Sequence, residues 1–226
     1  MYSEFLYRKK RDMKRILCFG DSLTWGYDPD RAVRFAPEDR WTGVLAAKLG
    51  EGYTVIEEGQ NGRTIATDDP AEGEKNGIRY IVPCLESQSP LDIMILMLGT
   101  NDLKRKFSYA ADDIAGEMEL FLRKVLSHNR FKMGDSMKIL LVSPPVVGDK
   151  IRDSVFGDSF GFENAREVSA KLGKLYGQLA DKYGCAFLDA SEVVRVSDSD
   201  SIHLDAEEQR KLADAIYNSL ISERML

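Results

Sequence analysis

The residue types that nucleophilic catalysis needs stand near the two ends of this chain. Ser22 lies in CFGDSLTWG (18–26) directly after an apolar segment, and His203 lies in DSDSIHLDAEEQ (198–209). A serine hydroxyl becomes a nucleophile when an imidazole accepts its proton and a carboxylate orients that imidazole. Asp200 stands three residues before His203, a spacing that lets its carboxylate reach Nδ1 and leaves Nε2 to act as the base. The pattern therefore predicts a site built from Ser22, His203 and Asp200.

Alternatives exist for each of these residues. Ser159 ends a second Phe-Gly-Asp-Ser run, in VFGDSFGF (155–162), but no strand-like segment precedes it, and Gly-Asp-Ser is ordinary turn chemistry. His128 lies at the polar end of an expected helix, where a surface or capping role is favoured. Asp198 stands two residues before Asp200 and stays open as the orienting acid.

Two further loops carry hydrogen-bond donors that such a site requires. GQNGR (59–63) follows the segment YTVIEE, and GTND (99–102) follows LDIMILML. Gly62 can present a backbone N–H where a side chain would crowd a substrate, and Asn101 can present its amide group. Together with the Ser22 N–H they would place three donors around one developing alkoxide. Each loop taken alone equally suits a simple turn.

The elements that must position these residues alternate along the chain. Short β-branched, apolar segments are separated by longer stretches of helical period, which predicts a parallel sheet covered by helices. We expect strands at 15–19, 53–58, 91–98, 138–143 and 185–189, and helices at 41–49, 77–86, 111–129, 164–183 and 206–223. Because ligands bind at the carboxyl ends of such strands, the loops that follow them should meet. The expected fold is an α/β/α sandwich in three layers.

Composition limits the classes of function. The 226 residues, 43% hydrophobic and 30% charged, fit one domain (15–226) after a basic N-terminal tail (1–14). The net charge of −6 argues against nucleic-acid or anionic-membrane binding. The tail lacks the apolar stretch of a signal peptide, and the run IMILML is too short to span a bilayer. Three cysteines cannot all pair and suggest reduced thiols, so we expect a cytoplasmic protein.

Four sequence blocks, in order, resemble those of the SGNH (GDSL) hydrolase family. They are FGDSLTWG with Ser22, NGR with Gly62, LGTND with Asn101, and DSIH with Asp200 and His203. More narrowly, RILCFGDSLTWGY, RFAPEDRWTGVLA, VIEEGQNGRT, MLGTND and VSPP are similar to the bacterial arylesterase and acyltransferase (perhydrolase) subgroup. The resemblance implies a flavodoxin-like fold and hydrolysis of short-chain esters, with acyl transfer as a side activity. It also implies no metal or organic cofactor, and a homo-oligomer such as an octamer.

The chain departs from the family pattern at three places. The first 14 residues have no counterpart, Ser201 stands where a glycine often follows the last-block aspartate, and the segment 146–162 does not follow the subgroup. That segment contains Phe156, Phe160 and Phe162, which are too apolar for open solvent. We expect it to cover the site or to make a subunit contact.

Residues beside the expected site suggest a specificity. Trp25 and Tyr27 would wall the acyl side and leave room for acetyl or propionyl, although Trp25 also suits the core. Arg63 would contact a polar substrate or make a structural salt bridge. A carbohydrate acetylesterase would use the same residues, and a flavodoxin-like module binding phosphate or flavin through the GDSLT loop is an alternative from another class. A zinc hydrolase is disfavoured because the chain has only two histidines.

Overall fold

Five parallel strands form the centre of the molecule in this computed structural model, which describes residues 13–226. In the order β2-β1-β3-β4-β5 the sheet consists of Tyr53–Gly59, Lys14–Gly20, Ile93–Met97, Lys138–Ser143 and Ala186–Asp189. Every neighbouring pair is parallel, and the register of β1 aligns Gly20 with Gly59 of β2 and with Met97 of β3. The carboxyl ends of these three strands therefore lie at one edge of the sheet.

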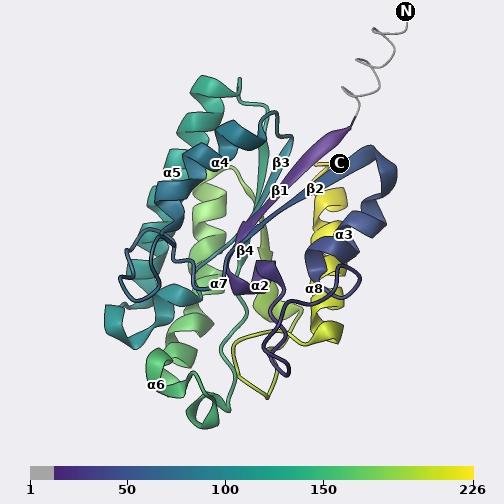
Figure 1. Cartoon of the computed structure of the whole chain (residues 1–226). Helices are drawn as coiled ribbons and strands as arrows, with labels where there is room; N and C mark the ends of the chain where they lie inside the picture. The colour runs from purple at the N-terminus through teal and green to yellow at the C-terminus, as the bar shows by residue number, and fades with distance from the viewer. Residues whose placement is uncertain (1–12) are drawn as a thin grey trace, which may run out of the picture.

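Helices cover both faces of the sheet (Figure 1). One face carries α4 (Gly77–Gln88), α5 (Ala111–Lys132) and α7 (Glu163–Tyr183), and the other carries α3 (Trp41–Leu49) and α8 (Ala206–Ser222). Side chains alternate along β1, so Leu17 and Phe19 join the first core while Ile16 and Cys18 join the second. The predicted three-layer sandwich with five parallel strands is confirmed.

Two short helices lie where the sequence shows no helical period. They are α2 (Ser22–Trp25), which follows β1 after one residue, and α6 (Gly157–Phe160), inside the segment expected to be irregular. Short 3₁₀ segments occupy Gly50–Gly52, Asn101–Leu103, Arg105–Phe107, Ile151–Asp153 and Ala190–Glu192. The basic run of the expected tail lies outside the described residues, and Lys14, counted with that tail, begins β1.

The connection pattern opens a crevice at the carboxyl edge of the sheet. From β1 the chain passes to β2 on one side, and the later strands β3, β4 and β5 follow on the other. The loops after β1 and β3 therefore run in opposite directions and leave a gap between them. Ligands bind at such gaps in open α/β sheets. Among residues 13–226, no helix has the length and apolar character needed to cross a membrane.

Candidate functional site

Ser22 is held at the start of α2 by a tight turn after β1. A side chain at Gly20 would overlap Thr24, and its Cβ would lie 2.7 Å from the carbonyl oxygen of Met97. The next residue, Asp21, caps the helix, because its Oδ1 accepts a hydrogen bond of 2.9 Å from the Leu23 N–H. Ser22 thus stands in the first helical turn, where backbone N–H groups have no partner within the helix.

His203 reaches Ser22 from the opposite end of the chain. Its Nε2 lies 2.8 Å from Oγ of Ser22, and its Nδ1 lies 2.6 Å from Oδ2 of Asp200. The other oxygen of Asp200 accepts hydrogen bonds of 2.9 Å from the backbone N–H groups of Ile202 and His203. All three side chains are buried. The structure therefore joins a hydroxyl, an imidazole and a carboxylate in one continuous hydrogen-bonded chain.

The surroundings of the Asp200 carboxylate favour its ionised form. Burial raises the pKa of Asp200, but the His203 ring and the two backbone N–H donors outweigh burial and hold the pKa below its ordinary value. Asp198, the alternative acid, points elsewhere: its side chain is 79% exposed and its Oδ2 lies 2.6 Å from Nζ of Lys150. The imidazole is oriented by Asp200.

Gly62 and Asn101 line the same cavity as Ser22 and His203. Gly62 has φ of +83°, a left-handed conformation that favours glycine. Asn101 is buried, and its Nδ2 donates a hydrogen bond of 3.1 Å to the carbonyl oxygen of Arg63. An amide nitrogen carries two hydrogens, so this bond fixes the side chain and leaves the second hydrogen for the cavity. Gly62 and Asn101, the residues expected from the loops after β2 and β3, thus line one cavity with Ser22.

The cavity encloses about 580 Å³ and has an apolar part and a charged part. Aromatic rings surround the imidazole, with the Tyr27 centroid 4.3 Å and the Phe156 centroid 5.7 Å from the ring of His203. The lining also contains Phe160, Ile202, Thr100 and Asn61, and the charged or polar residues Glu72, Lys104, Arg105, Lys106, Asp158 and Ser159. Phe156 and Phe160 come from the segment 146–162, so that segment contributes part of the cavity lining.

The structure separates the three residues predicted to bind substrate. Tyr27 lines the cavity, whereas Trp25 is half-buried outside its lining, where it packs on Tyr27 at 6.5 Å and against the guanidinium of Arg34. Within residues 13–226, Arg63 neither lines the cavity nor forms the salt bridge considered above. Its Nη1 donates to the carbonyl oxygens of Gly20, at 2.9 Å, and of Glu58. It is buried, with its guanidinium 4.3 Å from the centroid of the Phe19 ring.

The other candidate residues have simpler roles. Ser159 lines the cavity, but its hydroxyl donates to the carbonyl oxygen of Phe156, at 3.0 Å, as a turn serine does. His128 is half-buried in α5 and does not line the cavity. Ser201 takes the left-handed conformation, with φ of +63°, which is the physical reason why a glycine suits this position.

Sequence patterns did not identify several residues of the site. Glu72 and Lys104 line the cavity and pair with each other, at 3.0 Å, from segments 32 residues apart. Asp21 is fully buried, and burial raises its pKa from 3.8 to about 6 although the Leu23 N–H lowers it. Glu72 and Lys104 belong to no recognisable catalytic spacing, so only the folded structure shows them in the cavity of Ser22. Asp21 precedes Ser22 in the sequence, and the fold adds the burial of its carboxyl group.

The sequence also matches a known family over most of its length. The profile described as the GDSL-like Lipase/Acylhydrolase family matches residues 18–211. The chain belongs to this family. The matched range contains Ser22, Gly62, Asn101, Asp200 and His203.

Solved structures with the same fold include several esterases. An aryl esterase from M. smegmatis is 39% identical, with a TM-score of 0.85 over 92% of this chain and 99% of the other. A carbohydrate acetylesterase from Sinorhizobium meliloti is 38% identical, with a TM-score of 0.86 over 93% and 99%. A curated acetylxylan esterase from Xylanibacter ruminicola is 25% identical over 92% of this GDSL-like chain, which spans 43% of that longer protein.

Proposed function

We propose that the protein is a serine esterase that hydrolyses short-chain carboxylic esters through an acyl-enzyme. The observation that carries the proposal is the unbroken contact from Ser22 Oγ to His203 Nε2, at 2.8 Å, and from His203 Nδ1 to Asp200, at 2.6 Å. Membership of the GDSL-like lipase and acylhydrolase family supports it. The aryl esterase and acetylesterase neighbours support it as well.

In the first half of the reaction Ser22 Oγ forms a bond to the ester carbonyl carbon. Nε2 of His203 takes the hydroxyl proton as that bond forms, and Asp200 stabilises the resulting imidazolium. The carbonyl oxygen becomes an alkoxide, which the N–H groups of Ser22 and Gly62 and the amide of Asn101 receive. Collapse of this intermediate breaks the bond to the alcohol, which leaves with the proton from His203.

In the second half water attacks the acyl-enzyme at the same carbon. His203 takes one proton from the water and returns it to Ser22 Oγ as the acid is released. An alcohol or peroxide can replace water as the acceptor, because His203 can take the O–H proton of either one. The product is then a new ester or a peracid. We propose this acyl transfer as a side activity. These steps call for no metal or organic cofactor.

The aromatic part of the cavity limits the acyl group. Tyr27 and Phe156 lie against the ring of His203, and Phe160 stands beside them in the lining. We expect p-nitrophenyl acetate to be hydrolysed with a higher kcat/KM than p-nitrophenyl octanoate. A preference for octanoate would contradict the narrow acyl pocket, whereas no turnover of either ester would contradict the proposed activity itself.

A carbohydrate acetylesterase is a second candidate, favoured by the charged part of the cavity. Glu72, Asp158, Lys104 and Ser159 offer acceptors and donors for sugar hydroxyl groups, which a simple aryl ester does not use. Comparing kcat/KM for acetylated xylo-oligosaccharides and for phenyl acetate separates the two substrates. A higher value for the acetylated sugar supports the carbohydrate activity, and a higher value for phenyl acetate supports the aryl ester activity.

The proposals for location and assembly are those made from the sequence. The thiols of Cys18, Cys84 and Cys185 are free, as they would be in the reducing cytoplasm that we propose. We also propose a homo-oligomer. Val155, in the segment that contributes part of the cavity lining, is 88% exposed and is an apolar residue that a subunit contact would bury. Sedimentation velocity measures the oligomer size, and a monomer would contradict this part.

A further inference from the structure

One side of the site is built by the long connection between β2 and α4, residues 60–76, here called the β2–α4 loop. It contains Gly62 and folds back on itself, with isolated bridges from Thr64 to Asn76 and from Asp69 to Gly73. The Asn76 side chain closes it further by donating to the carbonyl oxygen of Ala66, at 2.7 Å. The loop is therefore an ordered element, and the place of Gly62 depends on what holds the loop.

The β2–α4 loop is attached to the segment 101–106, which carries Asn101. Asn101 Nδ2 donates to the Arg63 carbonyl oxygen at 3.1 Å, and the Ile65 N–H donates to Oδ1 of Asp102 at 3.0 Å. Both bonds are buried. The two proposed oxyanion donors outside α2, Gly62 and Asn101, thus lie on segments that are tied together directly.

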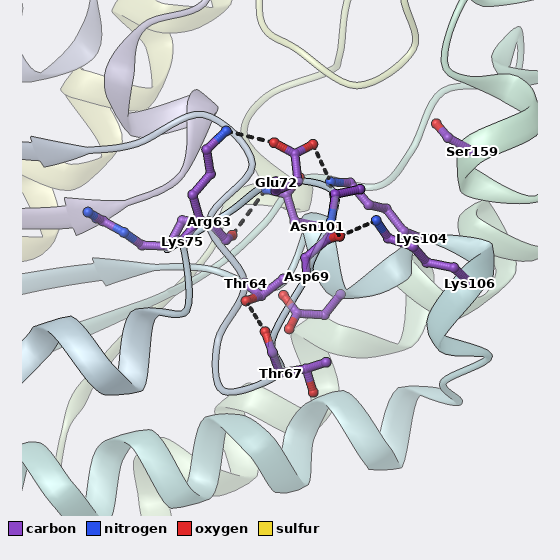
Figure 2. A network of polar contacts seen from close by, with 12 residues as sticks. Arg63, Thr64, Thr67, Asp69, Glu72, Lys75, Asn101, Lys104, Lys106 and Ser159 are labelled. Atoms are coloured by element: carbon purple, nitrogen blue, oxygen red, sulfur yellow. Dashed lines mark hydrogen bonds and ion pairs between the residues drawn. The ribbon is translucent and has the colours of Figure 1, made fainter.

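Five charged side chains, here called the ion cluster, extend this attachment toward the cavity (Figure 2). Lys104 Nζ lies 3.4 Å from Asp69 and 3.0 Å from Glu72, and Lys75 Nζ lies 2.6 Å from the other oxygen of Glu72. Lys106 pairs with Asp69 as well. The side chains of Lys104 and Asp69 are 9% and 1% exposed, so water and salt screen their attraction less than that of surface pairs.

Glu72 lies directly against Gly62. A Cβ built on Gly62 would lie 2.5 Å from Oε2 of Glu72 and 3.2 Å from Nζ of Lys75, so the carboxylate packs on the glycine with no spare room. Hydrogen bonding from Lys75, together with Lys104, holds the pKa of Glu72 below its ordinary value in spite of partial burial. The carboxylate is therefore charged at neutral pH and is fixed from two sides.

These contacts have a consequence for the oxyanion donors. The N–H of Gly62 can serve an alkoxide only if it points at the place where the oxygen develops. Lys104 follows Asn101 by three residues and holds Glu72, and the Glu72 carboxylate in turn packs against Gly62. The ion cluster thus couples the position of one donor to the position of the other.

We infer that Glu72 is a positioning residue of the oxyanion site, held by Lys104 and Lys75 so that the Gly62 N–H and the Asn101 amide converge on one oxygen. The inference rests on the proposed esterase function. Glu72 takes no part in bond making, and its effect on the reaction passes through Gly62.

Glu72→Gln tests this role with little change of shape. The amide cannot serve both ammonium groups, so the loop shifts and the Gly62 donor misses the alkoxide. With p-nitrophenyl acetate we expect kcat to fall by about tenfold while KM stays within about twofold, since the lost interaction belongs to the transition state. Inhibition by phenylboronic acid, whose serine adduct places an oxygen among the donors, should weaken by a similar factor.

Two further variants separate positioning from stability. Lys75→Met removes the second partner of Glu72 and should lower kcat in the same direction by a smaller factor. Arg79→Met is the matched control, because Arg79 pairs with Asp68 of the same loop but both side chains are more than half exposed. We expect its kcat and its boronate affinity to match the wild type.

The possible results distinguish the role of Glu72 from the esterase function. A kcat within about twofold of wild type in Glu72→Gln and Lys75→Met would overturn the inference. So would a fall in kcat with unchanged boronate affinity, because loss of active protein or of base function would then explain it. If the wild type hydrolyses no ester, the proposed function fails, and the role of Glu72 fails with it. Ester hydrolysis by the wild type together with unaffected variants contradicts the role of Glu72 alone.

Discussion

The carboxyl group of Asp21 provides a thermodynamic test beside the nucleophile. It is buried, one oxygen accepts the Leu23 N–H, and the other has no partner among the described residues. Burial raises its pKa from 3.8 to about 6. Replacing Asp21 by Asn keeps an oxygen for the helix cap and removes the ionisable group. The amide of the new side chain lies near the hydroxyl of Thr100, which itself lacks a partner among residues 13–226.

The size and sign of the effect follow from the pKa difference. A gap of about two pKa units corresponds to about 3 kcal/mol. The folded protein binds the Asp21 proton more tightly than the unfolded chain, so this group makes stability fall as pH rises from about 4 to about 6. Above that window the folded state carries the full cost of a buried charge. Asp21→Asn should therefore raise the free energy of unfolding by up to about 3 kcal/mol at pH 7 and by almost nothing at pH 4.

Urea denaturation followed by circular dichroism at pH 4, 5, 6 and 7 measures this difference. The matched control is Asp198→Asn, which neutralises an exposed carboxylate paired with Lys150 and should change stability by less than about 0.5 kcal/mol throughout. An Asp21→Asn variant that is less stable than wild type at pH 7, or whose advantage does not grow with pH, would refute the reasoning about Asp21.

Three substitutions test other parts of the site. Gly62→Ala should lower kcat by at least about tenfold, because it strains a residue at φ of +83° and pushes Glu72 away; an unchanged kcat contradicts the donor role. Ser201→Gly should raise the free energy of unfolding by about 1 kcal/mol, measured in urea, because φ is +63°; a loss of stability contradicts the strain argument. Tyr27→Ala should raise the ratio of kcat/KM for octanoate over acetate by about tenfold, and an unaltered ratio would remove Tyr27 from the acyl pocket.

The regular elements of the fold could be predicted from the sequence because each has a local signal. The segment Ile93–Met97 is fully buried on both faces and appears in the sequence as a continuous apolar run, as central parallel strands do. The long helices α5 and α7 carry a clear helical period and begin within one residue of their predicted positions. Element type and order follow from such patterns, since neighbouring residues determine them.

The short elements at the site could not be predicted in this way. Helices of four residues, such as α2 and α6, are too short to show a period, and tertiary contacts determine them. The sequence predicts a turn role for Ser159, which its hydrogen bond to the Phe156 carbonyl oxygen fits, but does not show that α6 places it in the cavity lining. Arg63 follows Gly62 in the NGR block, which suggests a place in the site, but its guanidinium lies over the rings of Phe19 and Tyr80 in the interior.

The pairs of the ion cluster could not be predicted from the sequence either. Glu72 pairs with Lys104 across 32 residues, and Lys106 pairs with Asp69 across 37. A single charged residue in a loop is usually solvated, so nothing local distinguishes these side chains from ordinary surface charge. The contact among Ser22, His203 and Asp200 could be predicted because the chain has only two histidines, whereas it has 31 Lys and Arg and 37 Asp and Glu.

The proposed reaction depends on Ser22 being the nucleophile. Labelling the protein with a fluorophosphonate and mapping the modified peptide tests this most directly, with Ser22→Ala as the control. We predict a single adduct on Ser22 in the wild type and none in Ser22→Ala. An adduct on Ser159, or an Ser22→Ala protein that still labels and still hydrolyses p-nitrophenyl acetate at the wild-type rate, would contradict the central claim.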